Sequence, residues 1–235
     1  KPRLNDPRLA QIIKDFQAKF SNISHYVYDA ISETAALNAF EKTYGKRALP
    51  SYDFSKASCI VSVDADFLGD WQGGGYDTGY ALTRVPKGKN GKAEMSKHFQ
   101  FESNMTLSGA NADFRIPTTS TEQQFVLAAL YGALTNKSYP TSLSKALKAK
   151  VSEIAVALKA AGKGAVVVTG LQNEDAQRAA LAINELLGSD VMDVRQNTSL
   201  RQGDASQINQ LVNDLNSGKV KGCLLYTSDA ADERR

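Results

Sequence analysis

The sequence predicts an α/β fold with mostly parallel sheets. Two runs of apolar, β-branched residues, at 58–63 and 164–170, have the length and composition of buried strands. The second run is followed by a helical pattern over 174–187, in which apolar residues recur at spacings of three and four. Strands that alternate with helices in this way form βαβ units, and such units build parallel sheets.

The first elements are predicted by their caps and their periodicity. A helix is expected over 6–20, with Asp6 as the N-cap and Pro7 at the first helical position. Residues 25–29 are aromatic and β-branched, which favours a strand. A second helical pattern over 32–44 ends before a glycine, a residue that commonly terminates helices.

The middle of the chain repeats the alternation of strands and helices. The buried strand at 58–63 leads into a loop over 64–75 that leaves its carboxyl end. A further strand is expected at 97–103. Helices are expected over 121–134 and 142–161, where apolar residues again follow helical spacing.

The last third contains the clearest strand, at 164–170. The helix after it, 174–187, carries its apolar face on Ala176, Ala179, Ala180, Ile183 and Leu187. A helix over 205–215 then leads into 219–222, which we interpret as the stub of a final strand.

The Lys-rich polar stretch around 136–150 is the expected boundary between two lobes. The first lobe would comprise residues 1–140 and the second residues 141–222, since both show the same rhythm of strands and helices. We therefore expect two Rossmann-like, three-layer α/β lobes with mostly parallel sheets.

The composition excludes several classes of protein. Of the 235 residues, 42% are hydrophobic and 23% are charged, a balance typical of soluble globular chains. The net charge of +3 is too small for a nucleic-acid surface. No apolar run approaches the ~20 residues of a membrane span. The sequence contains two cysteines, Cys59 and Cys223, and two histidines, His25 and His98, too few for a disulfide framework, a cysteine-based zinc or iron–sulphur site, or a His-rich metal site.

The two ends require separate treatment. The chain starts at Lys1 rather than Met, and we expect it to be part of something longer. Residues 223–235 can be written in codons that match the transposase adaptor used to prepare sequencing libraries. We therefore expect protein-coded sequence to end near Gly222 and residues 229–235 to be exposed, while residues 223–226 could extend the last strand by burying their apolar side chains. The alternative is a natural terminal strand over 223–227 followed by a polar tail.

Candidate sites lie where strands end. Ligands of open α/β sheets bind beyond the carboxyl ends of the strands, which directs attention to 64–71 and 169–173. Neither segment carries a dinucleotide fingerprint or a Walker loop. The glycines at 73–75 indicate a flexible loop rather than a phosphate cradle. The carboxylates of the first segment leave two roles open: a cation site, or the commoner role of solvated and helix-capping groups.

Several segments resemble a known family. Residues 28–32, 52–69, 104–117 and 164–188 are similar to the molybdopterin-oxidoreductase-like half of the iron–sulphur subunit of alternative complex III. That complex is a bacterial membrane quinol:electron-acceptor oxidoreductase. The resemblance covers essentially residues 1–222, and it implies a domain descended from molybdenum bis-pterin enzymes, with iron–sulphur clusters in a further domain.

The chain departs from the pattern of the parent enzymes at the positions expected to bind pterin. Their Gly-x-Asn-Pro is replaced here by the stretch that contains Asp64, Asp66 and Phe67, and their Pro-Gly-Thr-Asp by the stretch that contains Thr121 and Glu122. Losing the glycine hinders close backbone approach, and two carboxylates would face a pyrophosphate. The parents' metal-ligand region corresponds to 29–32, where no cysteine stands; Ser32 is an oxygen-ligand alternative.

The resemblance therefore implies a non-catalytic scaffold domain in a respiratory electron-transfer subunit. The expected partners are other subunits of a membrane respiratory complex, with no nucleic acid and no direct insertion into the membrane. We expect a peripheral position on the periplasmic side of the inner membrane, and no cofactor within residues 1–222. A partner-binding domain should also expose an apolar patch beyond the few hundred Å² usual for monomers. The alternatives are an active molybdenum bis-pterin oxidoreductase domain, which would bind molybdopterin, and a stand-alone nucleotide-binding protein.

Overall fold

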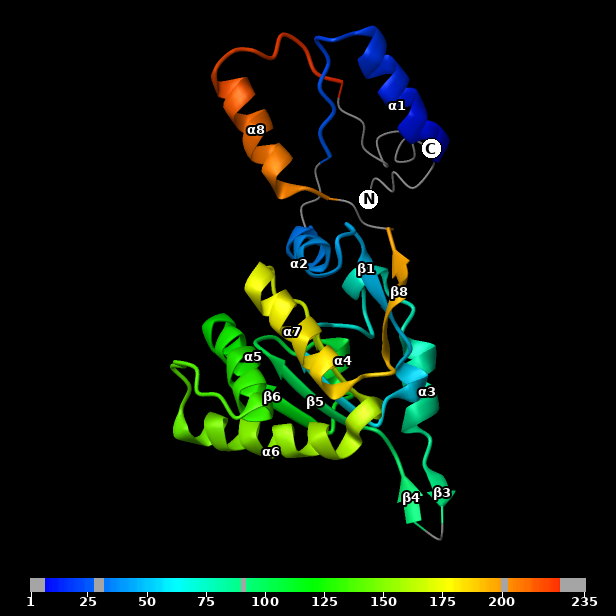
Figure 1. Cartoon of the computed structure of the whole chain (residues 1–235), viewed down its shortest axis with the longest axis vertical. Coiled ribbons are helices and arrows are strands. Elements are labelled where there is room, and N and C mark those ends of the chain that lie inside the picture. Colours follow the sequence, from blue (N-terminus) through cyan, green and yellow to red (C-terminus); the bar gives the residue numbers. More distant parts are fainter. Residues whose placement is uncertain (1–6, 28–31, 90–91, 200–202, 225–235) are drawn as a thin grey trace. The chain divides into compact units, whose positions relative to one another are not determined.

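The computed structural model describes residues 7–27, 32–89, 92–199 and 203–224. It divides into two compact units (Figure 1). One unit comprises Ala35–Thr198, and the other comprises Lys1–Thr34 with Ser199–Arg235. We refer to them as the sheet unit and the terminal unit.

A four-stranded parallel sheet forms the centre of the sheet unit (Figure 1). Its strands, in spatial order, are β6 (Phe114–Pro117), β5 (Lys97–Glu102), β2 (Cys59–Val63) and β7 (Ala165–Thr169). Every pairing is parallel. The prediction of an α/β fold with a parallel sheet is confirmed, and the strands expected at 58–63, 97–103 and 164–170 are its three longest members.

One face of the sheet is covered by three helices, α5 (Ser120–Thr135), α6 (Lys145–Ala161) and α7 (Glu174–Leu187). Successive side chains of a strand point to opposite faces, so alternate residues of the strands meet these helices. Val61, at the middle of β2, and Ile154, on α6, are both fully buried in this core. All three helices were predicted, because their apolar residues follow helical spacing.

The opposite face is covered by aromatic residues from shorter elements. These elements are the 3₁₀ turn η1 (Phe54–Lys56), the loop after β2 with its 3₁₀ turn η2 (Trp71–Gly73), and α3 (Asp77–Arg84). The Phe54 and Phe67 rings stack with their centroids 4.6 Å apart. Phe67 is fully buried. These aromatic side chains therefore form the hydrophobic core on this face of the sheet.

Smaller pairings complete the sheet unit. β1 (Leu49–Tyr52) pairs antiparallel with β8 (Met192–Thr198), and β3 (Lys87–Lys89) pairs antiparallel with β4 (Lys92–Glu94). α4 (Leu107–Ala110) is a single turn after β5. None of these elements, nor α3 and β6, was predicted from the sequence.

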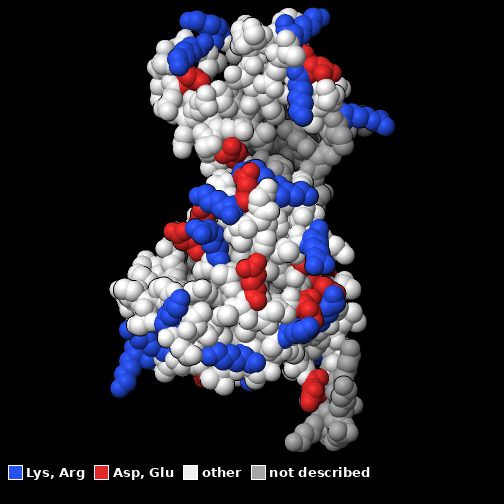
Figure 2. Space-filling model, viewed as in Figure 1, with Lys and Arg blue, Asp and Glu red and all other residues white. Residues whose placement is uncertain are grey.

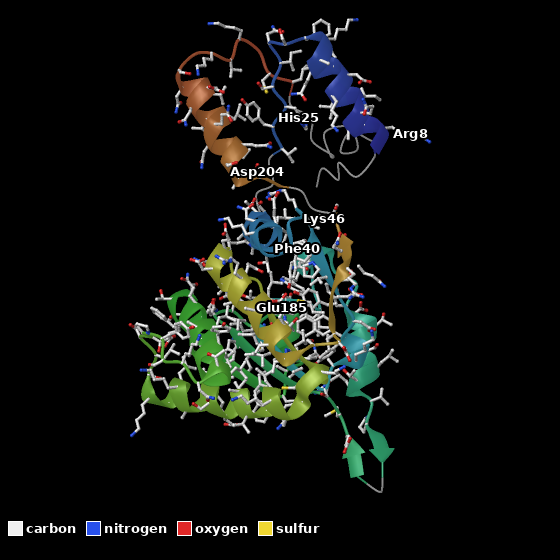
Figure 3. The ribbon with its side chains drawn as sticks, in the orientation of Figure 1. Arg8, His25, Phe40, Lys46, Glu185 and Asp204 are labelled. Atoms are coloured by element: carbon white, nitrogen blue, oxygen red, sulfur yellow. The ribbon has the colours of Figure 1, made fainter. Side chains whose placement is uncertain are left out.

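Helix α2 (Thr34–Tyr44) runs beside the β1–β8 pair (Figure 1). Its Phe40 is buried with Met192 of β8. The Tyr44 hydroxyl donates a hydrogen bond of 2.7 Å to Glu185 of α7, and Figure 3 labels both Phe40 and Glu185. These contacts hold the antiparallel pair and α7 in one core.

The terminal unit contains the predicted helices α1 (Pro7–Lys19) and α8 (Ala205–Asn216). The Tyr26 hydroxyl donates to Asp214 of α8 over 3.1 Å. Neither of the strands expected in this unit forms: residues 25–27 and 219–222 are not in strands, and residues 28–29 lie outside the described residues. The physical reason is the lack of a neighbouring strand to pair with in the described part of the chain.

The expected boundary near residue 140 falls between α5 and α6, which pack against the same sheet face. Strands from either side of it also pair, since β7 lies beside β2. The two compact units of the structure therefore do not meet at the Lys-rich stretch. Its polar residues lie partly in the loop between α5 and α6, and a surface loop has the same polar composition as a linker between domains. Within the tail, Cys223 and Leu224 are exposed and not in a strand, while 225–235 lie outside the described residues, as does Asp6.

The core assignment predicts unequal costs for two truncations on α6. Ile154→Ala should lower the free energy of unfolding by about 2–5 kcal/mol, because it leaves a cavity in the core. Val156→Ala, at a side chain that is 68% exposed on the same helix, should change it by about 0.5 kcal/mol or less. Urea denaturation of both variants measures the difference, and equal losses would contradict this packing.

Candidate functional site

The carboxyl edge of the sheet between β2 and β7 is the candidate site. The chain passes from β2 to β5 to β6 in one direction and then returns to place β7 on the other side of β2. Open α/β sheets bind ligands at the point where the strand order reverses in this way. Here that point lies between Asp64, which follows β2, and Gly170, which follows β7.

The two segments leaving these strands are in contact. A Cβ atom built on Gly170 would lie 1.9 Å from the backbone oxygen of Asp64. The Gly170 N–H donates to Val63 over 3.0 Å. The Trp71 indole N–H donates to the Thr169 carbonyl over 3.1 Å, so a large side chain also fills the space beside β7. Backbone and indole therefore occupy the place where a ligand would enter.

Asp64, at the end of β2, is an exposed member of the expected site. It adopts a left-handed backbone conformation with φ of 58°, and its carboxylate accepts a hydrogen bond of 3.4 Å from the Gln123 side chain. Partial burial raises the pKa of Asp64; the Gln123 hydrogen bond lowers it, and the nearby Glu102 charge raises it. The net direction is upward.

Asp66 and Phe67 have structural roles. The Asp66 carboxylate accepts hydrogen bonds of 2.8 Å from both the backbone N–H and the hydroxyl of Ser108, in the first turn of α4. The Phe67 ring lies in the aromatic core. Asp66 thus has the helix-capping role, one of the two roles that the sequence left open for these carboxylates, the other being a cation site.

Glu122 and Thr121 lie in the first turn of α5. The Glu122 carboxylate accepts from the Thr119 N–H over 2.9 Å, while the Thr119 hydroxyl accepts from the Glu122 N–H over 3.3 Å. This reciprocal pair is a capping box. The Thr119 N–H bond lowers the pKa of Glu122. Thr121 is exposed beside it.

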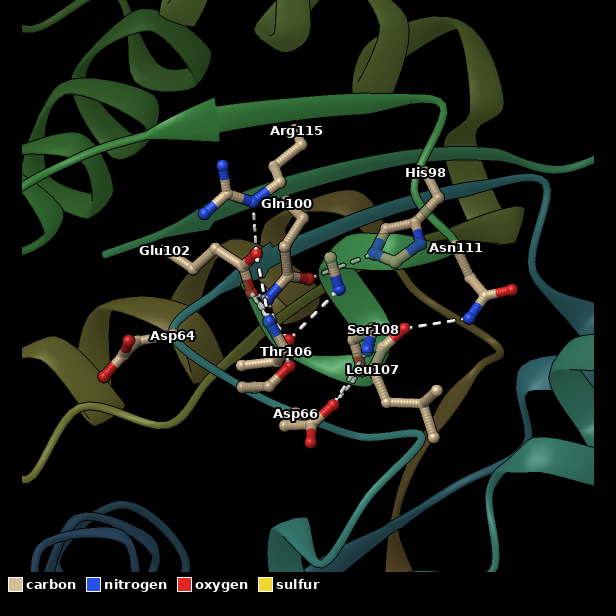
Figure 4. Close-up of polar contacts among 12 residues, drawn as sticks. Asp64, Asp66, His98, Gln100, Glu102, Thr106, Leu107, Ser108, Asn111 and Arg115 are labelled. Carbon is tan, nitrogen blue, oxygen red and sulfur yellow. Dashed lines mark hydrogen bonds and ion pairs between the residues drawn. The ribbon is translucent and has the colours of Figure 1, made fainter. Parts of the chain in front are cut away.

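A chain of buried polar side chains runs along β5, beneath the same edge (Figure 4). His98, Gln100 and Glu102 are each 0% exposed. His98 Nε2 lies 3.1 Å from Gln100 Oε1, and Gln100 Nε2 donates to Glu102 over 3.3 Å. At the other end, the Tyr80 hydroxyl lies 3.2 Å from His98 Nδ1. In the sequence, this row of buried polar side chains is marked by the alternation of polar and phenylalanine residues from His98 to Glu102.

Glu102 is a buried carboxylate with a full set of partners (Figure 4). Arg115 Nε donates to it over 2.6 Å, and the Thr106 hydroxyl donates over 2.6 Å. A Cβ on Gly109 would lie 1.8 Å from the Glu102 Oε1, so α4 approaches closely because that residue is glycine. A buried charge needs such compensation to persist.

His98 is held as a neutral ring. Burial lowers its pKa to about 4. Its backbone N–H donates to Asp113 over 2.8 Å, and Asp113 in turn binds Arg84 through two hydrogen bonds of 2.8 and 2.7 Å. The ring itself lies between Tyr80 and Gln100, and the side chain has no exposed surface.

The described residues offer little further chemistry. No group of three or more His, Cys, Asp or Glu side chains within them is placed to hold a metal ion. Burial raises the pKa of the Cys59 thiol to about 11, which keeps it protonated at neutral pH. Ser32 forms a hydrogen bond with Thr34, and residues 29–31 lie outside the described part.

Comparisons with known proteins add no assignment. No family model matches the chain, and no curated protein matches it. Within the described residues, no helix has both the length and the apolar character needed to cross a bilayer. Lys and Arg alternate with Asp and Glu over the face seen in Figure 2, which shows no large area of one sign.

The neutral buried ring predicts a pH dependence of stability. The unfolded chain takes up a proton on His98 below pH 6.5, whereas the folded chain does so only near pH 4. The free energy of unfolding should therefore fall as the pH drops through this window, by up to about 3 kcal/mol from this group. Urea denaturation at pH 7 and pH 5 should show a smaller loss for His98→Gln than for the unchanged chain. Equal losses would mean that this ring titrates normally.

The Glu102–Arg115 ion pair predicts that the effects of substitutions at these two residues on the free energy of unfolding are non-additive in a double-mutant cycle. Arg115→Met removes the cation and leaves the carboxylate buried, which should cost about 2–4 kcal/mol of unfolding free energy. Adding Glu102→Gln should recover a large part of that loss, because the remaining group is neutral. Thermal or urea denaturation of the four proteins gives the coupling. Additive losses would contradict a charge buried at this edge.

Proposed function

We propose that the chain is a non-catalytic, molybdopterin-oxidoreductase-like scaffold domain of the iron–sulphur subunit of a membrane quinol:electron-acceptor oxidoreductase. The observation that carries the proposal is the contact between Gly170 and Asp64, which fills the point where such a fold binds its ligand. The segment resemblances across residues 1–222 supply the family.

The strand order supports the finer description of the fold. Numbered by their order in the chain, the four parallel strands lie in the order 3-2-1-4, which is that of the central part of a Rossmann sheet. A Rossmann-like sheet is what the molybdopterin-oxidoreductase resemblance implies. We assign the sheet unit to that architecture on these two grounds.

The residues at this edge do not fit a bis-pterin cofactor. Its pyrophosphates need backbone N–H donors, helix N-termini or cations. Asp64 and a phosphate ~5 Å apart would repel by about 0.8 kcal/mol in water and roughly 3 kcal/mol at an effective dielectric of 20. Arg115, the basic residue of the stretch 110–122 that contains Thr121 and Glu122, is already paired with Glu102.

The unpaired polar atoms argue in the same direction. Among the described residues, the buried side-chain atoms without a hydrogen-bond partner are Gln72 Oε1, Thr118 Oγ1 and Gln123 Oε1. Of these, Gln123 reaches this edge, because its Nε2 donates to Asp64, and its oxygen can only accept hydrogen bonds and would not bind a phosphate oxygen. We therefore derive no chemical step through molybdenum or pterin.

A scaffold role places the electron transfer elsewhere in the assembly. Iron–sulphur clusters of the same subunit would carry the electrons, and this domain would hold other subunits in place. The proposal includes a peripheral position on the periplasmic side of the bacterial inner membrane, without nucleic-acid partners. A stable sheet unit with a filled carboxyl edge suits that role, because the polar side chains buried along β5 form hydrogen bonds with one another.

Cofactor content tests the proposal. The intact subunit, purified from a host that loads a molybdenum bis-pterin enzyme produced in parallel as a control, should contain no stoichiometric molybdenum or tungsten and no pterin fluorescence. It should co-purify with the other subunits of a quinol-oxidising membrane complex. Stoichiometric molybdenum or tungsten with pterin would instead establish the active oxidoreductase domain as the correct alternative.

A further inference from the structure

Two buried oxygens at the carboxyl edge of the sheet have no hydrogen-bond partner. Thr118 follows β6 and is 6% exposed, and Gln123 lies in α5 and is 0% exposed. Within the described part of the chain, Thr118 Oγ1 and Gln123 Oε1 form no hydrogen bond. An unpaired polar atom costs free energy when it is buried, so two such atoms at one edge point to a bound species that satisfies them.

The start of α5 brings these two side chains together. Thr119 is the N-cap of α5, and Glu122 is its third residue. Thr118 therefore stands immediately before the cap, and Gln123 stands at the fourth helical position. Side chains at these two positions pack on each other when they form a hydrophobic staple. Here both positions are polar, and both are buried.

Asp64 completes the group from the other side of β5. Its N–H donates to the Phe101 carbonyl over 2.8 Å. On the opposite side, the Thr118 N–H donates to the Glu102 carbonyl over 3.0 Å. Asp64 and Thr118 thus flank the end of β5, about two strand spacings or ~10 Å apart across the sheet. Gln123 spans this gap, because its Nε2 lies 3.4 Å from Asp64 Oδ1.

The spacing and the chemistry of the group suit a cation. The 3.4 Å between Gln123 Nε2 and Asp64 Oδ1 is long for a hydrogen bond. Two ligands at right angles around Ca²⁺, each at ~2.4 Å, are about 3.4 Å apart. A half-turn of the Gln123 amide would put its oxygen at that distance. Carboxylate, amide and hydroxyl oxygens are ligands of hard cations, whereas transition metals favour nitrogen and sulphur.

The charges around the group favour a cation over an anion. Burial raises the pKa of Asp64; the Gln123 hydrogen bond lowers it, and the Glu102 charge raises it. Arg115 is paired with Glu102 and so does not neutralise Asp64. The positive end of the α5 dipole is offset by Glu122 in its first turn. A cation would relieve the remaining negative charge, and a phosphate would add to it.

We propose that Asp64, Thr118 and Gln123 form a Ca²⁺ site at the carboxyl end of β5. Mg²⁺ fits less well, because it keeps several of its waters and two of these three oxygens are buried away from water. Waters that enter past the exposed Asp64 would complete the coordination. With one carboxylate, the dissociation constant should be on the order of 10⁻⁴–10⁻³ M.

The site is separate from the crevice between β2 and β7. Gly170 fills that crevice by its contact with the backbone oxygen of Asp64, so a cation on the Asp64 side chain would leave the crevice filled. The Asp64 side chain also lies apart from the hydrogen-bonded group around Glu102 (Figure 4). The Ca²⁺ site goes beyond the scaffold function and does not depend on it.

Isothermal titration calorimetry of the full chain with CaCl₂, in a background of about 0.15 M NaCl, tests the proposal. Asp64→Asn should weaken Ca²⁺ binding about tenfold or more, because it removes the one charged ligand. Asparagine also tolerates the left-handed backbone at this position. The matched control is Asp175→Asn, which removes an exposed carboxylate in the first turn of α7 and should leave the affinity unchanged.

Two further variants separate a ligand from a structural residue. Thr118→Val keeps the shape of the side chain and should weaken Ca²⁺ binding about threefold or more. In EDTA, its urea midpoint should stay the same or rise, because the unpaired hydroxyl is gone. Gln123→Glu adds a second carboxylate at the same place. It should tighten Ca²⁺ binding about tenfold and lower the urea midpoint in EDTA, since two carboxylates then repel each other.

Three results would overturn the proposal. If Ca²⁺ does not bind below ~10 mM, the unpaired oxygens belong to ordered water rather than to a cation site. If Ca²⁺ binds equally well to Asp64→Asn and Thr118→Val, the ion lies elsewhere on the chain. If MgCl₂ titrates with the same affinity as CaCl₂, the assignment to Ca²⁺ is wrong.

Discussion

The close approach of the backbones that leave β2 and β7 constrains the whole carboxyl edge of the sheet. Gly170 touches the Asp64 carbonyl, so any side chain at that position would push the two strands apart. Asp64 takes a left-handed conformation to turn the chain away. The loop that follows then folds back over the sheet, where Trp71 binds the end of β7. Strand pairing, loop path and the filling of the crevice thus depend on one contact.

The buried polar side chains of β5, His98, Gln100 and Glu102, lie beneath this edge and are also fully packed. A carboxylate with no exposure, Glu102, is stable only because Arg115 and Thr106 donate to it. His98 remains neutral between Tyr80 and the next polar side chain of β5. Groups that serve as acids, bases or ligands in enzymes are here partners of one another, and this arrangement supports the scaffold role that we propose.

The sequence predicted the elements whose side chains repeat with a clear period. The strand 58–63 is recognisable because its buried positions are apolar except for Ser62, and the helix 174–187 because its apolar residues recur at spacings of three and four, although Gln177 and Asn184 are buried as well. β8, from Met192 to Thr198, was missed because it is mostly polar and pairs at the margin with β1, which contains a proline. The burial of the polar residues of β5 was not predicted, because the same alternation with phenylalanine is expected for a strand whose polar face is in contact with water. Only tertiary packing distinguishes the two.

Native-state hydrogen exchange at the backbone amides of Asp64 and Gly170 tests the closed edge most directly. Asp64 N–H donates to Phe101 over 2.8 Å and Gly170 N–H to Val63 over 3.0 Å. If the edge is permanently filled, both amides should exchange only through global unfolding, with the same free energy as the central amides of β2. Exchange through a local opening, orders of magnitude faster than at β2, would show a crevice that opens to admit a ligand and would contradict the account.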